Sequence, residues 1–78
     1  MSNNTLAQLR EGEEARVTAL NGGHAFQRRL QSLGLKEGQT ICLVAKHPLG
    51  GPLVIKLQRR QITMGRGLAQ RVVVARKP

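Results

Sequence analysis

Two runs of alternating apolar residues constrain the fold of this chain more than any other feature. Residues 41–45 and 53–57 carry apolar side chains at every second position, which is the period of strands with one buried face. Valine and isoleucine are frequent in both runs, as a pleated surface favours. Residues 47–52 lie between the runs and contain two prolines and two glycines, which suit a long loop. The pattern therefore predicts a β-hairpin.

Three further strands are predicted to complete the core, because an isolated hairpin is marginal in water. They are residues 15–20, 61–64 and 71–75. Arg59 and Arg60 are predicted to form the turn before the second of them, although arginine is an unusual turn residue.

One helix is predicted after the first strand, where the apolar period changes from two to that of a helix. Phe26, Leu30 and Leu33 recur at this spacing, and Gly34 follows where a helix end needs positive φ. Leu35 can then fold back on Leu30. We predict a mainly β fold, a small, strongly bent antiparallel barrel of about five strands with one short helix inserted after the first strand.

The length of 78 residues predicts a single domain spanning residues 1–78. Because Phe26 is the only aromatic residue, the core must be aliphatic. No apolar run approaches the roughly 20 residues that span a bilayer. The first five residues lack a signal sequence, and Cys42 is the only cysteine, so we expect a cytoplasmic location.

The charge of the chain is strongly positive, with 13 Lys and Arg against four acids and a formal net charge of +9. No acid follows Glu37, whereas eight basic residues do. Such a surface attracts nucleic acid, an anionic membrane or an acidic protein face. A solvated basic exterior without a specific partner is the alternative interpretation.

Catalytic and metal-binding chemistry find little support in the sequence. The chain has no Asp, and three of its four Glu fall within residues 11–14, so we predict that it is not an enzyme. The soft metal ligands are His24, Cys42 and His47, and none forms a local ligand pair. We therefore predict no metal site and no cofactor. The segment Gly65-Arg66-Gly67 lacks the Lys-Ser/Thr of a phosphate loop and is predicted to be a bulge or tight bend.

The order of these motifs resembles the ferrous iron transport protein A (FeoA) family from about Leu6 to Val74. The matching segments are a Gly-Gly pair before the helix, then Arg28-Arg29-Leu30, residues 33–38, the loop and strand of residues 47–55, and the closing Ala69, Val72 and Val74. Arg59-Arg60 departs from the family pattern, in which Gly or Asn is more usual at the turn.

This resemblance implies an SH3-like β-barrel in the cytoplasm that acts beside the membrane transporter ferrous iron transport protein B, with no catalytic activity of its own. The same domain also ends some metal-dependent repressors, so the fold alone does not fix the role.

Our leading hypothesis is a non-enzymatic module that docks on the cytoplasmic part of this transporter and supports or regulates Fe(II) uptake. Leu49, beside two glycines, is the expected apolar anchor. The candidate partner-binding residues are Arg28, Arg29, His47, Pro48, Leu49, Gly50, Gly51, Pro52, Arg59, Arg60 and Arg66.

Three alternatives stay open at this point. A basic barrel that binds nucleic acid is the main one, although the chain lacks aromatic residues for base stacking. A position near an anionic membrane surface also fits the charge. Weak self-association through exposed barrel edges is the third.

Overall fold

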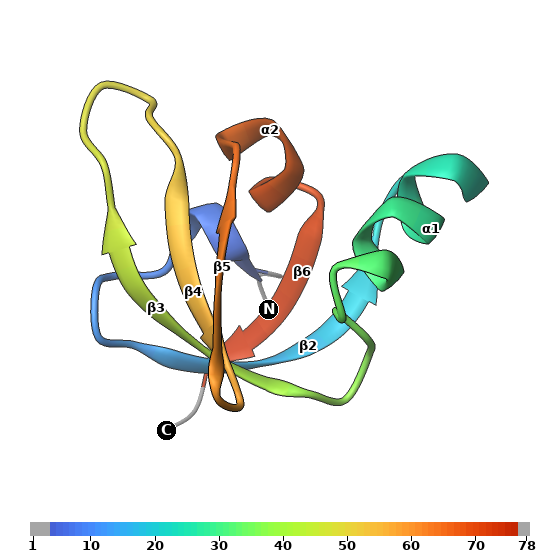
Figure 1. Cartoon of the computed structure of the whole chain (residues 1–78), viewed down its shortest axis with the longest axis horizontal. Coiled ribbons are helices and arrows are strands. Elements are labelled where there is room, and N and C mark those ends of the chain that lie inside the picture. The colour runs from blue at the N-terminus through green and yellow to red at the C-terminus, as the bar shows by residue number, and fades with distance from the viewer. Residues whose placement is uncertain (1–3, 77–78) are drawn as a thin grey trace.

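A computed structural model describes residues 4–76 as an antiparallel sheet that curves around one core (Figure 1). Its six strands lie in the order β1-β6-β2-β3-β4-β5. They are β1 (Asn4–Thr5), β2 (Glu14–Leu20), β3 (Thr40–Lys46), β4 (Leu53–Leu57), β5 (Arg60–Met64) and β6 (Val72–Arg76). A 3₁₀ turn (Leu6–Gln8) and two helices, α1 (His24–Ser32) and α2 (Arg66–Ala69), complete the chain. The mainly β fold class is thus confirmed.

The core is aliphatic, as the composition requires. Every buried side chain among the described residues is hydrophobic. The largest side chains with almost no exposure are Leu6, Leu9, Val17, Leu30, Leu35, Ile41, Leu43, Leu53, Ile55 and Val72. They come from β2, β3, β4, β6, α1 and the segments beside them, so these elements depend on one another for burial of their apolar faces.

The predicted hairpin is present as β3 and β4, with Leu43 opposite Ile55. The pairing then shifts by one residue, so that Ala45 lies opposite Val54 and Val44 is the extra residue of a β-bulge. Val44 follows the buried Leu43 and lies on the outer face of β3, where 39% of its surface is exposed. A bulge increases the local twist, which helps a short sheet to curl around a small core.

The end of α1 follows the predicted arrangement. Gly34 has φ of +97°, and its N–H donates to the carbonyl of Gln31 (2.9 Å). The N–H of Leu35 donates to the carbonyl of Leu30 (3.1 Å), so the two hydrogen bonds form a Schellman motif. Leu30 and Leu35 are both buried, which joins the end of the helix to the core.

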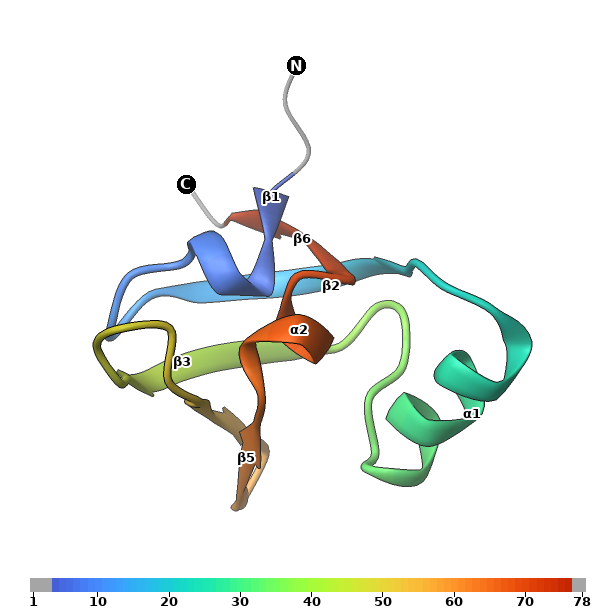
Figure 2. The same cartoon turned by 90° about the horizontal axis from the view of Figure 1, so that it is seen from above.

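Helix α1 lies beside the barrel rather than across its face (Figure 2). Phe26 is half-buried, and the guanidinium of Arg71 lies 5.4 Å from its ring centroid, within range of a cation–π contact. The Gln27 side chain donates to the carbonyl of Leu20 (3.1 Å). These contacts hold the first turn of α1 against β2 and the start of β6.

Two details of the predicted strand pattern were wrong. The sheet has a sixth strand, since Asn4 and Thr5 pair with Val74 and Val73. The turn between β4 and β5 lies one residue earlier than predicted, at Gln58 and Arg59, so Arg60 already belongs to β5.

Gln58 has φ of +58° at the first central position of this turn, where glycine is the usual residue of a hairpin of this length.

The segment predicted as a bulge or tight bend after β5 was also wrong. It begins the short helix α2, which returns the buried Ala69 to the core.

The positive φ of Gly34 gives a first test of the fold. We expect Gly34→Ala to lower the free energy of unfolding by about 1–2 kcal/mol, because a Cβ strains a left-handed residue. The new methyl group would also collide with the guanidinium of Arg60. Urea denaturation measures the change.

Gly67→Ala is the matched control, since Gly67 lies in α2 with open space around its Cα. This control should keep or slightly raise stability, because alanine favours helix. Equal stability of Gly34→Ala and the parent protein would contradict the proposed role of this helix end.

Candidate docking surface

The loop between β3 and β4 ends in a tight turn whose tip is Leu49 and Gly50. Both residues have positive φ, +61° and +75°. The N–H of Gly51 donates to the carbonyl of Pro48 (3.1 Å) and closes the turn. Positive φ at both central residues is the pattern of a type I′ turn. One residue further out on each side, the N–H of His47 donates to the carbonyl of Pro52 (3.1 Å).

The tip exposes a large apolar side chain to solvent. Leu49 has a relative exposure of 102%, so its side chain contacts almost nothing in the chain. Leucine in the left-handed region costs about 1–2 kcal/mol relative to ordinary backbone, and Asn or Gly is the usual choice at such a site. Backbone strain of this kind gathers at functional sites. The residue thus combines an unfavourable backbone conformation with an unfavourable solvent contact.

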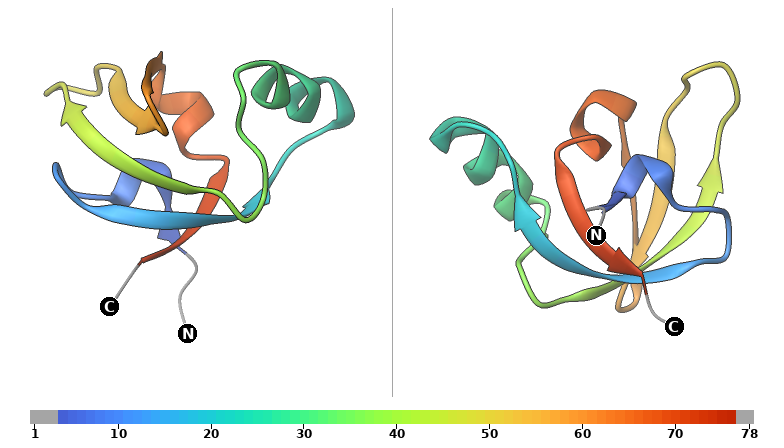
Figure 3. Two further views of the ribbon diagram at one scale, coloured as in Figure 1. Left: turned by 60° about the horizontal axis from the view of Figure 1, so that its bottom comes forward. Right: turned by 180° about the vertical axis from the view of Figure 1, so that it is seen from behind.

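Helix α2 supports this loop from the side. The Arg66 guanidinium donates through Nη2 to the carbonyl oxygen of His47 (2.9 Å). Figures 1 and 3 show the loop and α2 at the same end of the barrel. The structure therefore brings together seven of the predicted partner-binding residues, namely His47, Pro48, Leu49, Gly50, Gly51, Pro52 and Arg66.

The other four predicted residues form a second group at the far end of the β4–β5 hairpin. Arg60 donates through Nη2 to the carbonyl of Leu33 (2.9 Å), just beyond the exposed residues Arg28 and Arg29 of α1. Arg59 lies in the adjacent turn.

Leu53 pairs with Met64 at the loop end of this hairpin, whereas Leu57 pairs with Arg60 at the turn end. At about 3.4 Å per residue, the two groups are separated by roughly 14 Å of strand. The eleven residues thus make two surfaces rather than one.

Two of the four acids accept hydrogen bonds from backbone N–H groups, and one of them also forms an ion pair. Glu11 accepts from the N–H of Lys46 (2.8 Å). Glu13 accepts from the N–H of Arg10 (2.8 Å) and forms an ion pair with Arg76 (3.0 Å). These carboxylates hold the segment before β2 to β3 and β6, so they do little to neutralise the exposed basic side chains elsewhere.

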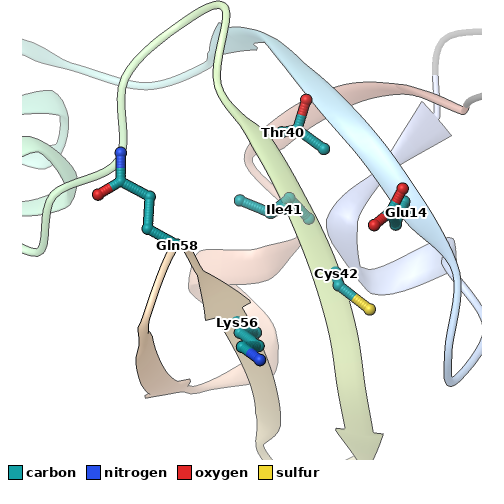
Figure 4. A pocket seen from close by; sticks show the side chains of 6 residues that line it. All are labelled: Glu14, Thr40, Ile41, Cys42, Lys56 and Gln58. Atoms are coloured by element: carbon teal, nitrogen blue, oxygen red, sulfur yellow. The ribbon is translucent and has the colours of Figure 1, made fainter.

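A shallow depression of about 380 Å³ lies across β2, β3 and β4 (Figure 4). Glu14 pairs with Cys42, and Cys42 pairs with Lys56, so the three residues follow one line across the strands. The Cys42 thiol is half-buried and lies 3.9 Å from the carbonyl oxygen of Leu43. Among the described residues that line the depression, none is a histidine that could act as a base beside the thiol.

Between residues 4 and 76, no group of three or more His, Cys, Asp or Glu side chains is close enough to hold a metal ion. None of the helices in this range has the length and apolar character needed to cross a bilayer.

Sequence reasoning missed two features of the loop. Glycine at position 50 is compatible with positive φ, but no neighbouring residue indicates that Leu49 also has positive φ. The Arg66–His47 hydrogen bond joins residues 19 apart in the chain, and only the packing of α2 beside the loop creates it.

Comparison with known proteins agrees with the resemblance. The FeoA domain matches residues 4–76. A Fe(2+) transport protein A from Methanocaldococcus jannaschii is 33% identical over 69 residues, which cover 88% of this chain and 82% of that protein. The crystal structure of an iron uptake regulatory protein, FeoA, has a TM-score of 0.89 at 33% identity and covers 97% of this chain and 100% of that chain.

Two further solved structures have similar folds, but only one of them is also similar in sequence. A FeoA protein from Chlorobium tepidum is 31% identical with a TM-score of 0.85, and the match covers 96% of this chain and 71% of that one. A manganese-dependent transcriptional repressor shares the fold at 17% identity and a TM-score of 0.87, but only 42% of its chain is covered. From the family match and these relatives, the chain belongs to the FeoA family and has its SH3-like barrel fold.

Proposed function

We propose that this protein is a non-catalytic accessory of ferrous iron transport that docks on the cytoplasmic part of ferrous iron transport protein B. Membership of the FeoA family supports the role in transport. One observation supports docking, namely that Leu49 is fully exposed at the tip of a closed turn. The protein supports or regulates Fe(II) uptake from the cytoplasmic side, and it acts as a single domain without a cofactor.

The shape of the loop fits insertion into a partner pocket. A type I′ turn is narrow, and Gly50 and Gly51 beside Leu49 have no side chains to block a close approach. A few residues buried at the centre of an interface contribute most of its binding free energy, and an exposed side chain at the tip of a narrow turn can reach such a central pocket. The basic residues of the second surface, Arg28, Arg29, Arg59 and Arg60, favour an acidic partner face and speed the encounter.

Leu49→Asp tests the docking site in cells that lack the gene and carry a plasmid copy. We expect ferrous iron uptake to fall to the level of cells without the gene, because a carboxylate cannot enter an apolar pocket unpaired. The fold should persist, since the side chain is fully exposed.

Leu49→Met is the matched control and should keep uptake near the parent level, because methionine retains apolar character and adapts to irregular pockets. Normal uptake with Leu49→Asp would show that the loop is not the contact.

Leu49→Asn separates stability from docking. Asparagine tolerates the left-handed region, so we expect the free energy of unfolding to rise by about 0.5–1 kcal/mol while uptake falls. Thermal unfolding should show a midpoint a few degrees higher. A lower midpoint would mean that leucine is not strained at this position.

Nucleic-acid binding is the competing function, and the net charge of +9 favours it. The one aromatic ring gives it little help, because Phe26 is half-buried and Arg71 lies over it. We expect binding to mixed-sequence DNA and RNA at low salt to disappear near 0.15 M salt, as purely electrostatic adsorption does. Fluorescence anisotropy against salt concentration measures this. Tight binding that persists at 0.15 M salt would favour the competing function.

A further inference from the structure

We propose that Arg66 is a positioning residue that holds the β3–β4 loop in the conformation that presents Leu49. This inference rests on the docking role proposed for Leu49. It assigns Arg66 a function inside the free protein, because its Nη2 already donates to the carbonyl of His47.

The hydrogen bond acts at the point where the loop leaves β3. Lys46 is the last residue of β3, and His47 is the first residue of the loop. The two other backbone hydrogen bonds of the loop, Gly51 to Pro48 and His47 to Pro52, lie within the loop and fix its shape. The base of the loop is fixed by the pairing of Lys46 with Leu53 and by the hydrogen bond from the Lys46 N–H to Glu11. The Arg66 hydrogen bond joins the loop to α2, and α2 is tied to the core by the buried Ala69.

The loop is packed tightly enough to transmit this constraint to its tip. A Cβ at Gly51 would lie 3.0 Å from the Cβ of His47 and 3.2 Å from the carbonyl oxygen of Pro48. Two prolines further limit the backbone on either side of the turn. Displacement of His47 would therefore move Leu49 with it rather than be absorbed within the loop.

The contact with Arg66 is itself unfavourable in one respect. Its Nε atom is buried and has no hydrogen-bond partner within residues 4–76. A buried donor without an acceptor destabilises a fold, and such groups in native proteins call for an explanation. Here the unpaired Nε lies in the contact that supports the strained Leu49 turn. Strained features gather at functional sites, so the presence of two of them here supports a functional role for the geometry of the loop.

A fixed loop also benefits binding directly. A segment that is ordered before it meets its partner loses less conformational entropy on association. Arg66 thus improves affinity without touching the partner.

The experiment compares Arg66→Met with Arg16→Met in the full chain. Methionine keeps much of the apolar stem of arginine and removes both the hydrogen bond and the unpaired Nε. Arg16 is an exposed residue of β2, so its replacement makes the same change in net charge away from the loop. Amide hydrogen exchange in the free protein, followed by NMR, reports the order of the loop.

We expect the amides of His47 and Gly51 to exchange about tenfold faster in Arg66→Met, with the core amides and the unfolding midpoint unchanged. Arg16→Met should exchange like the parent protein. Parent-like exchange in Arg66→Met would overturn the inference whatever the partner does.

Affinity for the purified cytoplasmic part of ferrous iron transport protein B gives the second measurement. We expect about tenfold weaker binding for Arg66→Met, loss of binding for Leu49→Asp, and parent affinity for Arg16→Met. Faster exchange with parent affinity, while Leu49→Asp loses binding, would overturn the positioning role alone. Parent affinity of Leu49→Asp would instead overturn the docking role of the loop, and with it the functional part of this inference.

Discussion

The pairing of β2 with both β6 and β3 is the contact on which the rest of this structure depends. Residues 15–20 of β2 pair with residues 72–76 of β6, while residues 14–16 also pair with residues 40–42 of β3. One strand thus joins the last element of the chain to the central hairpin. Without it, the β3–β4–β5 meander would keep its local pairing but lose the apolar surface that faces it. The small aliphatic core exists only when these distant segments meet.

Local sequence patterns predicted the elements that local interactions determine. Alternation marked β3 and β4, and helical spacing followed by Gly34 marked both α1 and its end, because these signals lie within a few residues of one another. The strand β1 was missed, since its two residues acquire their conformation by pairing with β6, about 70 residues away. The candidate site divides in the same way. Its exposed loop was predictable from proline and glycine, whereas the Arg66 contact depends on tertiary packing.

Two of the few acids in this chain make hydrogen bonds within the fold, which leaves the surface potential to the basic residues. Glu11 accepts from the backbone N–H of Lys46 at the end of β3, and Glu13 accepts from that of Arg10 before β2 and also pairs with Arg76. Most of the 13 basic side chains remain to define the outer potential. A protein with a net charge of +9 repels copies of itself, which favours association with an acidic partner over self-association through the edges of the sheet.

The antiparallel pairing of β1 with β6 has a practical consequence. Asn4 lies opposite Val74, so both described ends of the chain emerge at one edge of the sheet. Figures 1 and 3 show that edge lying away from the β3–β4 loop. A fluorophore or a surface tether attached beyond either end would leave Leu49 free. Immobilised protein can therefore present the loop to a partner in solution, with the tether behind it.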